Sequence, residues 1–555
     1  MMRKRDLLLS TLIGLATASP LAAAPFPTIA LAVVEPIDAQ LAATLARAKP
    51  GELVAVIIHH PMQVHLAALR RSGLGERLQA HATVIQALQA HYAATLGPFE
   101  AHLRRLGGTK IAALWVSNSV AVTLPAAAIK QLQSHPAVGS ITPDSVITIK
   151  PLTYSQLPPS EWNIAAIKAP QVWNLGYSGQ GKVVGVLDTG ADPLHQDLIG
   201  RYRGGVSSWF DPYGQHTNKP YDASGHGTSV TSLVVGGNAD GTDVGVAPGA
   251  QWIAARVFDD SGKGLTSGIH RAFQWMLNPD GNPATADFPN VVNASWNMTP
   301  TAGLCNQEFA PDVQALRASE IAVVFAAGND GPAGNTSDSP ANNLGALSVG
   351  AVDPGPAVAG FSSRGPSACD GTIFPTLAAP GVNIKAADLT YGGIFPNSYA
   401  NVTGMTPATA HASGAILVLQ SAFPAAKVAD IERALTASAL PLGTVDANNN
   451  TGAGELDMLA AYNLLLRSFT PAPPAQLSSS VLVAATYNST ARSMTVQATD
   501  ALGKSAAMQL VGYGPMTWVM AKGQWAITVR TSALPPILII SAKDGTRSFS
   551  TAPLS

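Results

Sequence analysis

Cysteine and charge are the scarcest features of this sequence. Of its 555 residues, two are cysteines and only 12% are charged, and the formal net charge is −1. Two cysteines cannot by themselves form a structural zinc site. A near-neutral chain gives no electrostatic case for binding nucleic acid or an anionic membrane. Because 46% of the residues are hydrophobic, with 51 Gly and 41 Pro, we expect a compact, loop-rich globular protein rather than a disordered one.

The N-terminus has the pattern of an export signal. MMRKRD is basic, LLLSTLIGLATAS is a short apolar run, and LAAA supplies small residues. The run is too short to span a bilayer, so residues 1–24 are predicted to be a signal peptide, and no later stretch is apolar enough for a membrane span. We therefore expect a secreted protein, extracellular, or periplasmic if the source is a Gram-negative cell. In that oxidising setting Cys305 and Cys369 are predicted to form a disulfide.

Composition and periodicity divide the rest of the chain into three units and two linkers. Residues 36–150 alternate strand-like and helical segments, which suggests a small α+β unit of the split β-α-β (ferredoxin-like) kind. Residues 478–555 hold short strands separated by Gly, Asn and Asp turns, which predict a small all-β sandwich. The Pro-rich stretches 151–163 and 468–477 lack periodicity and are predicted to be linkers, the first of them exposed. The largest unit, 164–467, lies between the linkers.

That largest unit alternates buried strands with helices. GKVVGVLDTG, AQWIAARVF, FPNVVNASW and IAVVFAAGN are apolar without alternation, as expected for strands covered on both faces. Helical patterns lie between them, for example HGTSVTSLVVG and LTSGIHRAFQWML. The pattern predicts an α/β fold with a doubly wound parallel sheet, whose chemistry lies at the carboxyl ends of the strands.

Three motifs carry the candidate chemistry. Asp188 ends a buried strand in VVGVLDTGAD, where a carboxylate can orient an imidazole, although DTG alone also suits a turn. His226 lies between glycines in SGHGTSV, at the start of an apolar helix. In NVTGMTPATAHASG a small-residue turn leads into a helix. The Thr406 hydroxyl is thereby placed at a helix N-terminus, where free N–H groups favour a developing negative charge.

Taken together, the order Asp, His, hydroxyl matches the subtilisin arrangement, and the chain resembles the subtilisin family of secreted serine proteases over roughly residues 50–467. The resemblance implies an endopeptidase that cleaves protein or peptide substrates through an acyl-enzyme. Asp188 would orient His226, His226 would act as general base, and Thr406 would be the nucleophile. The Asn329 side chain and the Thr406 N–H would stabilise the oxyanion. Further motifs in the family's order are GVAPGA (245–250), FAAGNDG (325–331), FSSRGP (361–366) and APG (379–381).

The same resemblance makes the unit 36–150 an inhibitory propeptide, so that the chain would carry its own intramolecular partner. It implies no cofactor for the chemistry. A structural calcium ion is compatible with the sequence, but no residues can be named as its ligands. The predicted substrate-binding residues are Ser295, Trp296, Asn297, Ala326, Ala327 and Gly328.

The nucleophile motif departs from the family pattern. Gly-Thr-Ser-Met-Ala-x-Pro-His corresponds here to Gly-Met-Thr-Pro-Ala-Thr-Ala-His, so Thr406 replaces the serine and Met405 replaces a hydroxyl beside the oxyanion. The extra methyl group of Thr406 restricts its first torsion and adds bulk beside His226. Proline at 407 is benign in a first helical turn. In the pocket wall, Asn297 and Met298 replace two glycines and are expected to narrow the cleft.

Two alternatives remain open from the sequence. The substitutions around Thr406 and Asn297 are compatible with a catalytically impaired pseudoprotease that binds peptides or proteins through the same cleft. The C-terminal unit could instead carry the main role as an attachment domain, with Tyr513, Trp518 and Trp525 as an aromatic face, although such residues are more often part of a core.

Overall fold

The computed structural model describes the main body of the chain from residue 37 onward. The described ranges are 37–66, 77–154, 162–298, 300–355, 357–443, 447–473, 482–488, 490–499, 508–510, 514–522, 524–531, 538–541 and 547–550. The predicted signal peptide, residues 1–24, and Tyr513 lie outside them.

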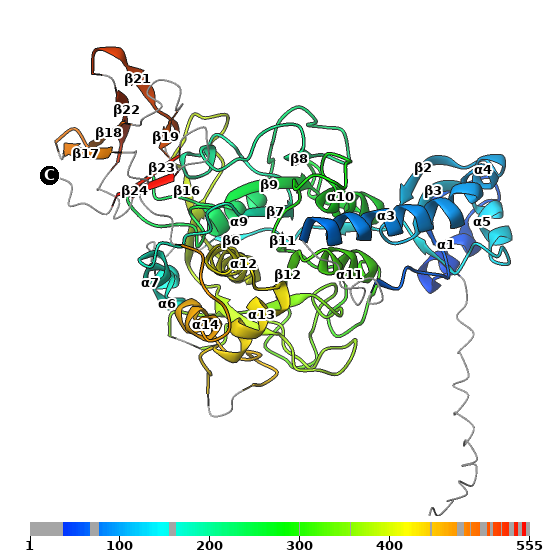
Figure 1. Ribbon diagram of the computed structural model, residues 1–555. Coiled ribbons are helices and arrows are strands. Elements are labelled where there is room, and N and C mark those ends of the chain that lie inside the picture. The colour runs from blue at the N-terminus through cyan, green and yellow to red at the C-terminus, as the bar shows by residue number, and fades with distance from the viewer. Residues whose placement is uncertain are drawn as a thin grey trace, which may run out of the picture.

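A seven-stranded sheet forms the centre of the molecule, and all of its strand pairs are parallel (Figure 1). The strands are fully or almost fully buried along their length, which confirms that both faces of the sheet are covered. In spatial order they are β14 (Leu377–Pro380), β13 (Leu347–Val352), β12 (Ala322–Ala326), β11 (Val291–Ala294), β7 (Val183–Asp188), β9 (Gln251–Arg256) and β8 (Trp209–Phe210).

Helices cover the two faces of this sheet. α9 (His226–Val235) packs beside α12 (Met405–Ala422), and α10 (Thr266–Leu277) packs beside α11 (Ala310–Ala318). The predicted doubly wound α/β class is therefore confirmed. The remaining helices of this unit are α6 (Trp162–Ala166), α7 (Ala169–Trp173), α8 (Gln196–Ile199), α13 (Val428–Ala437) and α14 (Met458–Leu465).

The first unit is built on a four-stranded antiparallel sheet in the order β2-β3-β1-β4. Helix α3 extends from this unit and contributes Val84, Ile85 and Leu88 to the core of the large unit, so the two units share a packed boundary. The helices and strands of the first unit are α1 (Ala39–Arg47), β1 (Leu53–His59), α3 (Arg77–Thr95), α4 (Gly97–Arg105), β2 (Thr109–Leu114), β3 (Ser119–Pro125), α5 (Ala126–Leu132) and β4 (Ser140–Pro143).

The stretch predicted as a free linker, 151–163, is instead partly structured. β5 (Val146–Thr148) pairs with β10 (Lys263–Leu265), and β6 (Thr153–Tyr154) pairs with β16 (Tyr399–Thr403), which also pairs with β15 (Ile384–Ala387). Strand β6 was not predicted, because two residues of strand are too few to show a period in sequence. We call residues 144–154 the crossing segment.

The C-terminal region forms two four-stranded antiparallel sheets. Trp525 is buried and lies edge-on to Trp518, with ring centroids 5.6 Å apart, so this pair belongs to a small core and not to an open aromatic face. The elements are β17 (Leu482–Asn488), β18 (Ser493–Thr499), β19 (Gln509–Leu510), β20 (Gly514–Pro515), β21 (Thr517–Val519), a 3₁₀ turn (Met520–Lys522), β22 (Gln524–Arg530), β23 (Leu538–Ser541) and β24 (Arg547–Ser550).

Cys305 and Cys369 form the predicted disulfide. They come from the loops that follow β11 and β13, so the bond joins two loops at the carboxyl edge of the central sheet. Within the described part of the chain, none of the helices combines the length and the apolar character needed to cross a membrane.

Candidate active site

Three residues from distant parts of the sequence meet at the carboxyl edge of the central sheet. Asp188 is the last residue of β7, His226 is the first residue of α9, and Thr406 is the second residue of α12. The Nδ1 atom of His226 donates to Oδ1 of Asp188 at 2.7 Å. Its Nε2 atom, which is then the acceptor, lies 3.2 Å from Oγ1 of Thr406. The structure therefore places a hydroxyl, a base and an orienting carboxylate in one hydrogen-bonded line.

Burial and the charge of a neighbouring carboxylate shift the pKa of His226 in opposite directions. Burial by itself lowers the pKa of the imidazole, but the adjacent Asp188 carboxylate outweighs this effect and raises the pKa above its usual value of 6.5. The Asp188 oxygen that faces the ring also accepts the backbone N–H of Thr189 at 2.7 Å. The hydrogen bond at Nδ1 thus holds the imidazole in one tautomer, in which Nε2 can accept a proton.

Two residues that the sequence analysis missed hold the start of α9 in place. Asp222 accepts hydrogen bonds from the N–H groups of Gly225 and Thr228 and from the hydroxyl of Thr189. A Cβ atom on Gly227 would lie 2.0 Å from the carbonyl oxygen of Gly190, so only glycine fits after His226. A signal was available, because an aspartate shortly before a helix start commonly caps exposed N–H groups.

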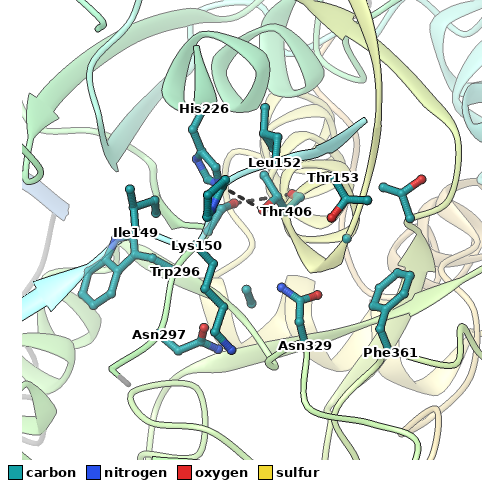
Figure 2. Close-up of a pocket in the computed structure, with 15 residues that line it drawn as sticks. Ile149, Lys150, Leu152, Thr153, His226, Trp296, Asn297, Asn329, Phe361 and Thr406 are labelled. Atoms are coloured by element: carbon teal, nitrogen blue, oxygen red, sulfur yellow. Dashed lines mark hydrogen bonds between the residues drawn. The ribbon is translucent and has the colours of Figure 1, made fainter. Parts of the chain in front are cut away.

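Asn329 follows β12 and faces the start of α12. Its Oδ1 atom accepts the N–H of Met405 at 3.1 Å. Because an N–H group can only donate, the amide oxygen must face Met405, and the NH₂ group is left to point into the cavity (Figure 2). The N–H of Thr406 belongs to the first helical turn, which has no intrahelical acceptor. Both donors are available to a negative oxygen.

The other hydroxyls of this motif are engaged elsewhere. Thr409 donates to the carbonyl oxygen of Met405, and the Thr403 hydroxyl accepts the N–H of Asn383. Thr406 is therefore the only one of the three with a hydrogen bond to His226. Proline at 407 is accommodated in the first turn, and its carbonyl oxygen accepts Nδ1–H of His411 at 2.6 Å.

A cavity of about 300 Å³ opens beside Thr406 and His226. Four of the predicted substrate-binding residues line it, namely Ser295, Trp296, Asn297 and Ala326. Ala327 and Gly328 follow in the chain but do not belong to its lining. The crossing segment also lines this cavity through residues 149–153, which the sequence analysis did not anticipate.

The pocket wall differs from the expectation that larger residues only narrow it. Asn297 lines the cavity, and its amide donates to Oδ2 of Asp338 at 3.2 Å. Met298 packs into the hydrophobic core. Both side chains that replace the family's glycines therefore have structural partners. Among the residues that the structure describes, no group of three or more His, Cys, Asp or Glu is placed to hold a metal ion.

Comparison with known proteins agrees with this arrangement. A sequence profile of the subtilase family matches residues 179–458, about half of the chain. The chain belongs to the subtilase family. It is 37% identical to bacillopeptidase F of Bacillus subtilis over 314 residues, which is 53% of this chain but only 21% of that relative's length. It is 33% identical to subtilisin E of Bacillus subtilis over 328 residues, 59% of this chain and 76% of that relative. A thermostable alkaline protease of Halalkalibacterium halodurans is 31% identical over 322 residues, with 58% and 78% covered.

Proposed function

We propose that this subtilase hydrolyses peptide bonds with Thr406 as its nucleophile. Oγ1 of Thr406 attacks the substrate carbonyl carbon while Nε2 of His226 takes the hydroxyl proton. The carbonyl electron pair moves onto oxygen, and the resulting oxyanion accepts hydrogen bonds from the Asn329 amide and the Thr406 N–H. When the C–N bond breaks, His226 returns the proton to the leaving amine. Water then hydrolyses the ester, with His226 again as base, and restores Thr406.

One observation carries this proposal. The 3.2 Å contact between Oγ1 of Thr406 and Nε2 of His226 supports a proton path, because it continues the 2.7 Å contact between His226 and Asp188. A pseudoprotease that only binds peptides does not need a hydroxyl group hydrogen-bonded to a buried histidine and aspartate. The contact therefore favours an enzyme over a pseudoprotease that only binds peptides.

We also propose that the first unit inhibits the enzyme as an intramolecular partner, after export from the cell. Residues 149–153 line the same cavity as Thr406, so a substrate and the crossing segment would compete for one place. Asp144 secures the segment by accepting hydrogen bonds from the N–H and hydroxyl groups of Ser267. The Cys305–Cys369 disulfide supports export, because such bonds persist in oxidising compartments.

The test is hydrolysis of casein by the purified protein, with His226→Ala as the control. We expect peptide release that rises from acid to alkaline pH with a midpoint above 6.5, because His226 must be neutral to act as base and its pKa is raised. The His226→Ala protein should fall to background. Hydrolysis that survives this substitution would exclude the proposed base. Absence of hydrolysis under all conditions, both in the unaltered protein and after cleavage of the first unit, would favour the pseudoprotease.

A further inference from the structure

The crossing segment lies across the active site in an extended form. Its first half, β5, pairs antiparallel with β10, and the N–H of Ile149 extends this pairing to the carbonyl oxygen of Gly262 at 2.9 Å. Its second half, β6, pairs antiparallel with β16 on the other side of Thr406. The residues between the two strands pass beside Thr406 and His226. The chain thus holds its own peptide across the reacting groups, bound through backbone hydrogen bonds on both sides.

Lys150 is the residue of this segment whose side chain enters the cavity. Figure 2 shows its side chain passing between Asn297 and Asn329. Its ammonium nitrogen lies 3.2 and 3.3 Å from the two carboxylate oxygens of Asp330. Asp330 directly follows the proposed oxyanion donor Asn329. A lysine ammonium group bound to Asp330 therefore lies beside the residue that supplies the proposed oxyanion donor.

A second carboxylate lies behind the first. Asp338 is only 2% exposed, and it accepts hydrogen bonds from Asn297 and from the hydroxyl of Thr301, each at 3.2 Å. Burial, followed by the neighbouring Asp330, raises the pKa of Asp338 to about 8. A Cβ atom on Gly328 would lie 2.2 Å from Oδ2 of Asp338, so a glycine at this position leaves room for the carboxylate.

Two neighbouring carboxylates with one buried member repel each other unless a cation or a proton is present. The Lys150 ammonium group lowers the pKa of Asp338, but burial and the neighbouring Asp330 outweigh it, so the pair binds the cation and also holds a proton near neutral pH. The Lys150 and Asp330 side chains are 39% and 34% exposed, so their direct attraction is screened by water. Because the pKa of Asp338 is raised to about 8, Asp338 shares a proton with Asp330 near neutral pH, and the pair presents a single negative charge to a basic side chain.

We propose that Asp330 and Asp338 form an acid pair that recognises a basic side chain, lysine above all, on the residue that precedes the scissile bond. Asn297 positions this pair through its hydrogen bond to Asp338. This hydrogen bond gives a specific role to the asparagine that stands where the family pattern has glycine. The inference rests on the proposed peptidase function, because it names the substrates of the same site. In the full chain, the Lys150 side chain binds the acid pair in the way that we propose for the lysine side chain of a substrate.

The first test uses the full chain with three anilide substrates, Thr-Ile-X-p-nitroanilide, in which X is lysine, norleucine or glutamate. The crossing segment competes equally with all three, so ratios of kcat/KM are informative. We expect lysine to exceed norleucine by about tenfold and glutamate by more. In Asp330→Asn the ratio of lysine to norleucine should fall towards one. Asp280→Asn, which removes a charge from the exposed loop after α10, is the matched control and should keep the unaltered ratio.

A lysine ratio near one in the unaltered protein, or an unchanged ratio in Asp330→Asn, would overturn the acid-pair proposal while leaving the peptidase intact. Failure to hydrolyse any substrate, even after the inhibitory first unit has been cleaved off, would instead overturn the proposed function.

In that event a second measurement, which needs no turnover, decides the lysine site. Hydrogen exchange of residues 146–154 in the full chain should accelerate about fivefold in both Lys150→Met and Asp330→Asn. The double variant should exchange no faster than either single variant, because both remove one shared interaction. Unchanged exchange in the single variants, or fully additive effects, would exclude the site.

Discussion

Thr406 is the residue on which turnover depends. Its side chain is 7% exposed and its hydroxyl already faces His226, so a serine-like position is accessible to threonine. The remaining difference is the methyl group, which limits the rotation that the oxygen must make as it moves from the imidazole towards a carbonyl carbon. Ser295, whose hydroxyl donates to the Thr406 carbonyl oxygen at 3.4 Å, also holds this turn close to the pocket wall.

We expect Thr406→Ser to increase kcat/KM on a peptide substrate by about tenfold. Strained side-chain rotamers cost up to about 1.5 kcal/mol, and a tenfold change in rate corresponds to about 1.4 kcal/mol. Thr406→Ala should reduce activity by about four orders of magnitude or more, since it removes the nucleophile. Thr409→Ser, whose hydroxyl bonds to the helix backbone, is the matched control and should change the rate little. Full activity in Thr406→Ala would mean that another group is the nucleophile.

At the scale of elements, helix α3 joins the first unit to the large one. His81, on this helix, is buried and stacks on Phe288 with ring centroids 3.6 Å apart. Burial, together with the nearby Arg77, lowers the pKa of His81 from 6.5 to about 4. The packed helix requires a neutral His81 ring. The stability that this packing contributes is therefore complete above pH 6.5 and is lost as the pH falls towards 4.

The burial of His81 therefore predicts that the packing of α3 on the large unit is sensitive to acid. Between pH 7.5 and 5 we expect the opening free energy of α3 to fall by about 2 kcal/mol, the linkage value for a shift of this size. Hydrogen exchange corrected for intrinsic rates measures it. His81→Phe keeps the ring stack and should abolish most of the fall. His91→Phe, at a more exposed site on the same helix, should leave it unchanged. An unaltered protein whose α3 opens equally at both pH values would contradict this account.

At the scale of the whole molecule, the Cys305–Cys369 bond closes the stretch of chain that carries both members of the acid pair, Asp330 and Asp338. The two cysteines are 64 residues apart in sequence, and the loop between them includes Asp338. Met298 and Asn306, on one side of the bond, also donate backbone hydrogen bonds to Ser339, next to Asp338. The disulfide therefore closes a long loop around the pocket floor.

Replacing both cysteines by alanine should destabilise the large unit by up to about 4 kcal/mol, because closing a loop of this length restricts the unfolded chain. In a calorimetric scan this corresponds to a melting transition roughly 10 °C lower. The transition of the C-terminal region, which contains no cysteine, serves as the internal control. A bridged protein should also fail to react with a maleimide until it is reduced. Immediate labelling of the native protein, or an unchanged transition, would count against the bond.

Much of this molecule could be predicted from local patterns. The apolar runs of β7, β9, β11 and β12 are contiguous in sequence, and Asp188, His226 and Thr406 each lie at the junction of a recognisable strand, turn or helix. Such features depend on neighbours a few residues away, so periodicity and motif order were sufficient for the α/β sheet and for the subtilase family.

The contacts that give the site its individual character could be found only in the folded chain. Lys150 and Asp330 are 180 residues apart, and Asn297 and Asp338 are 41 residues apart. No periodicity links such positions, because a polar side chain takes the partner that the packing of distant loops brings to it. Proline and short length made residues 151–154, the end of the crossing segment, look like part of a linker, although β6 pairs with β16 there. Its place across Thr406 is a property of the tertiary structure, because strand pairing depends on which edges meet in space.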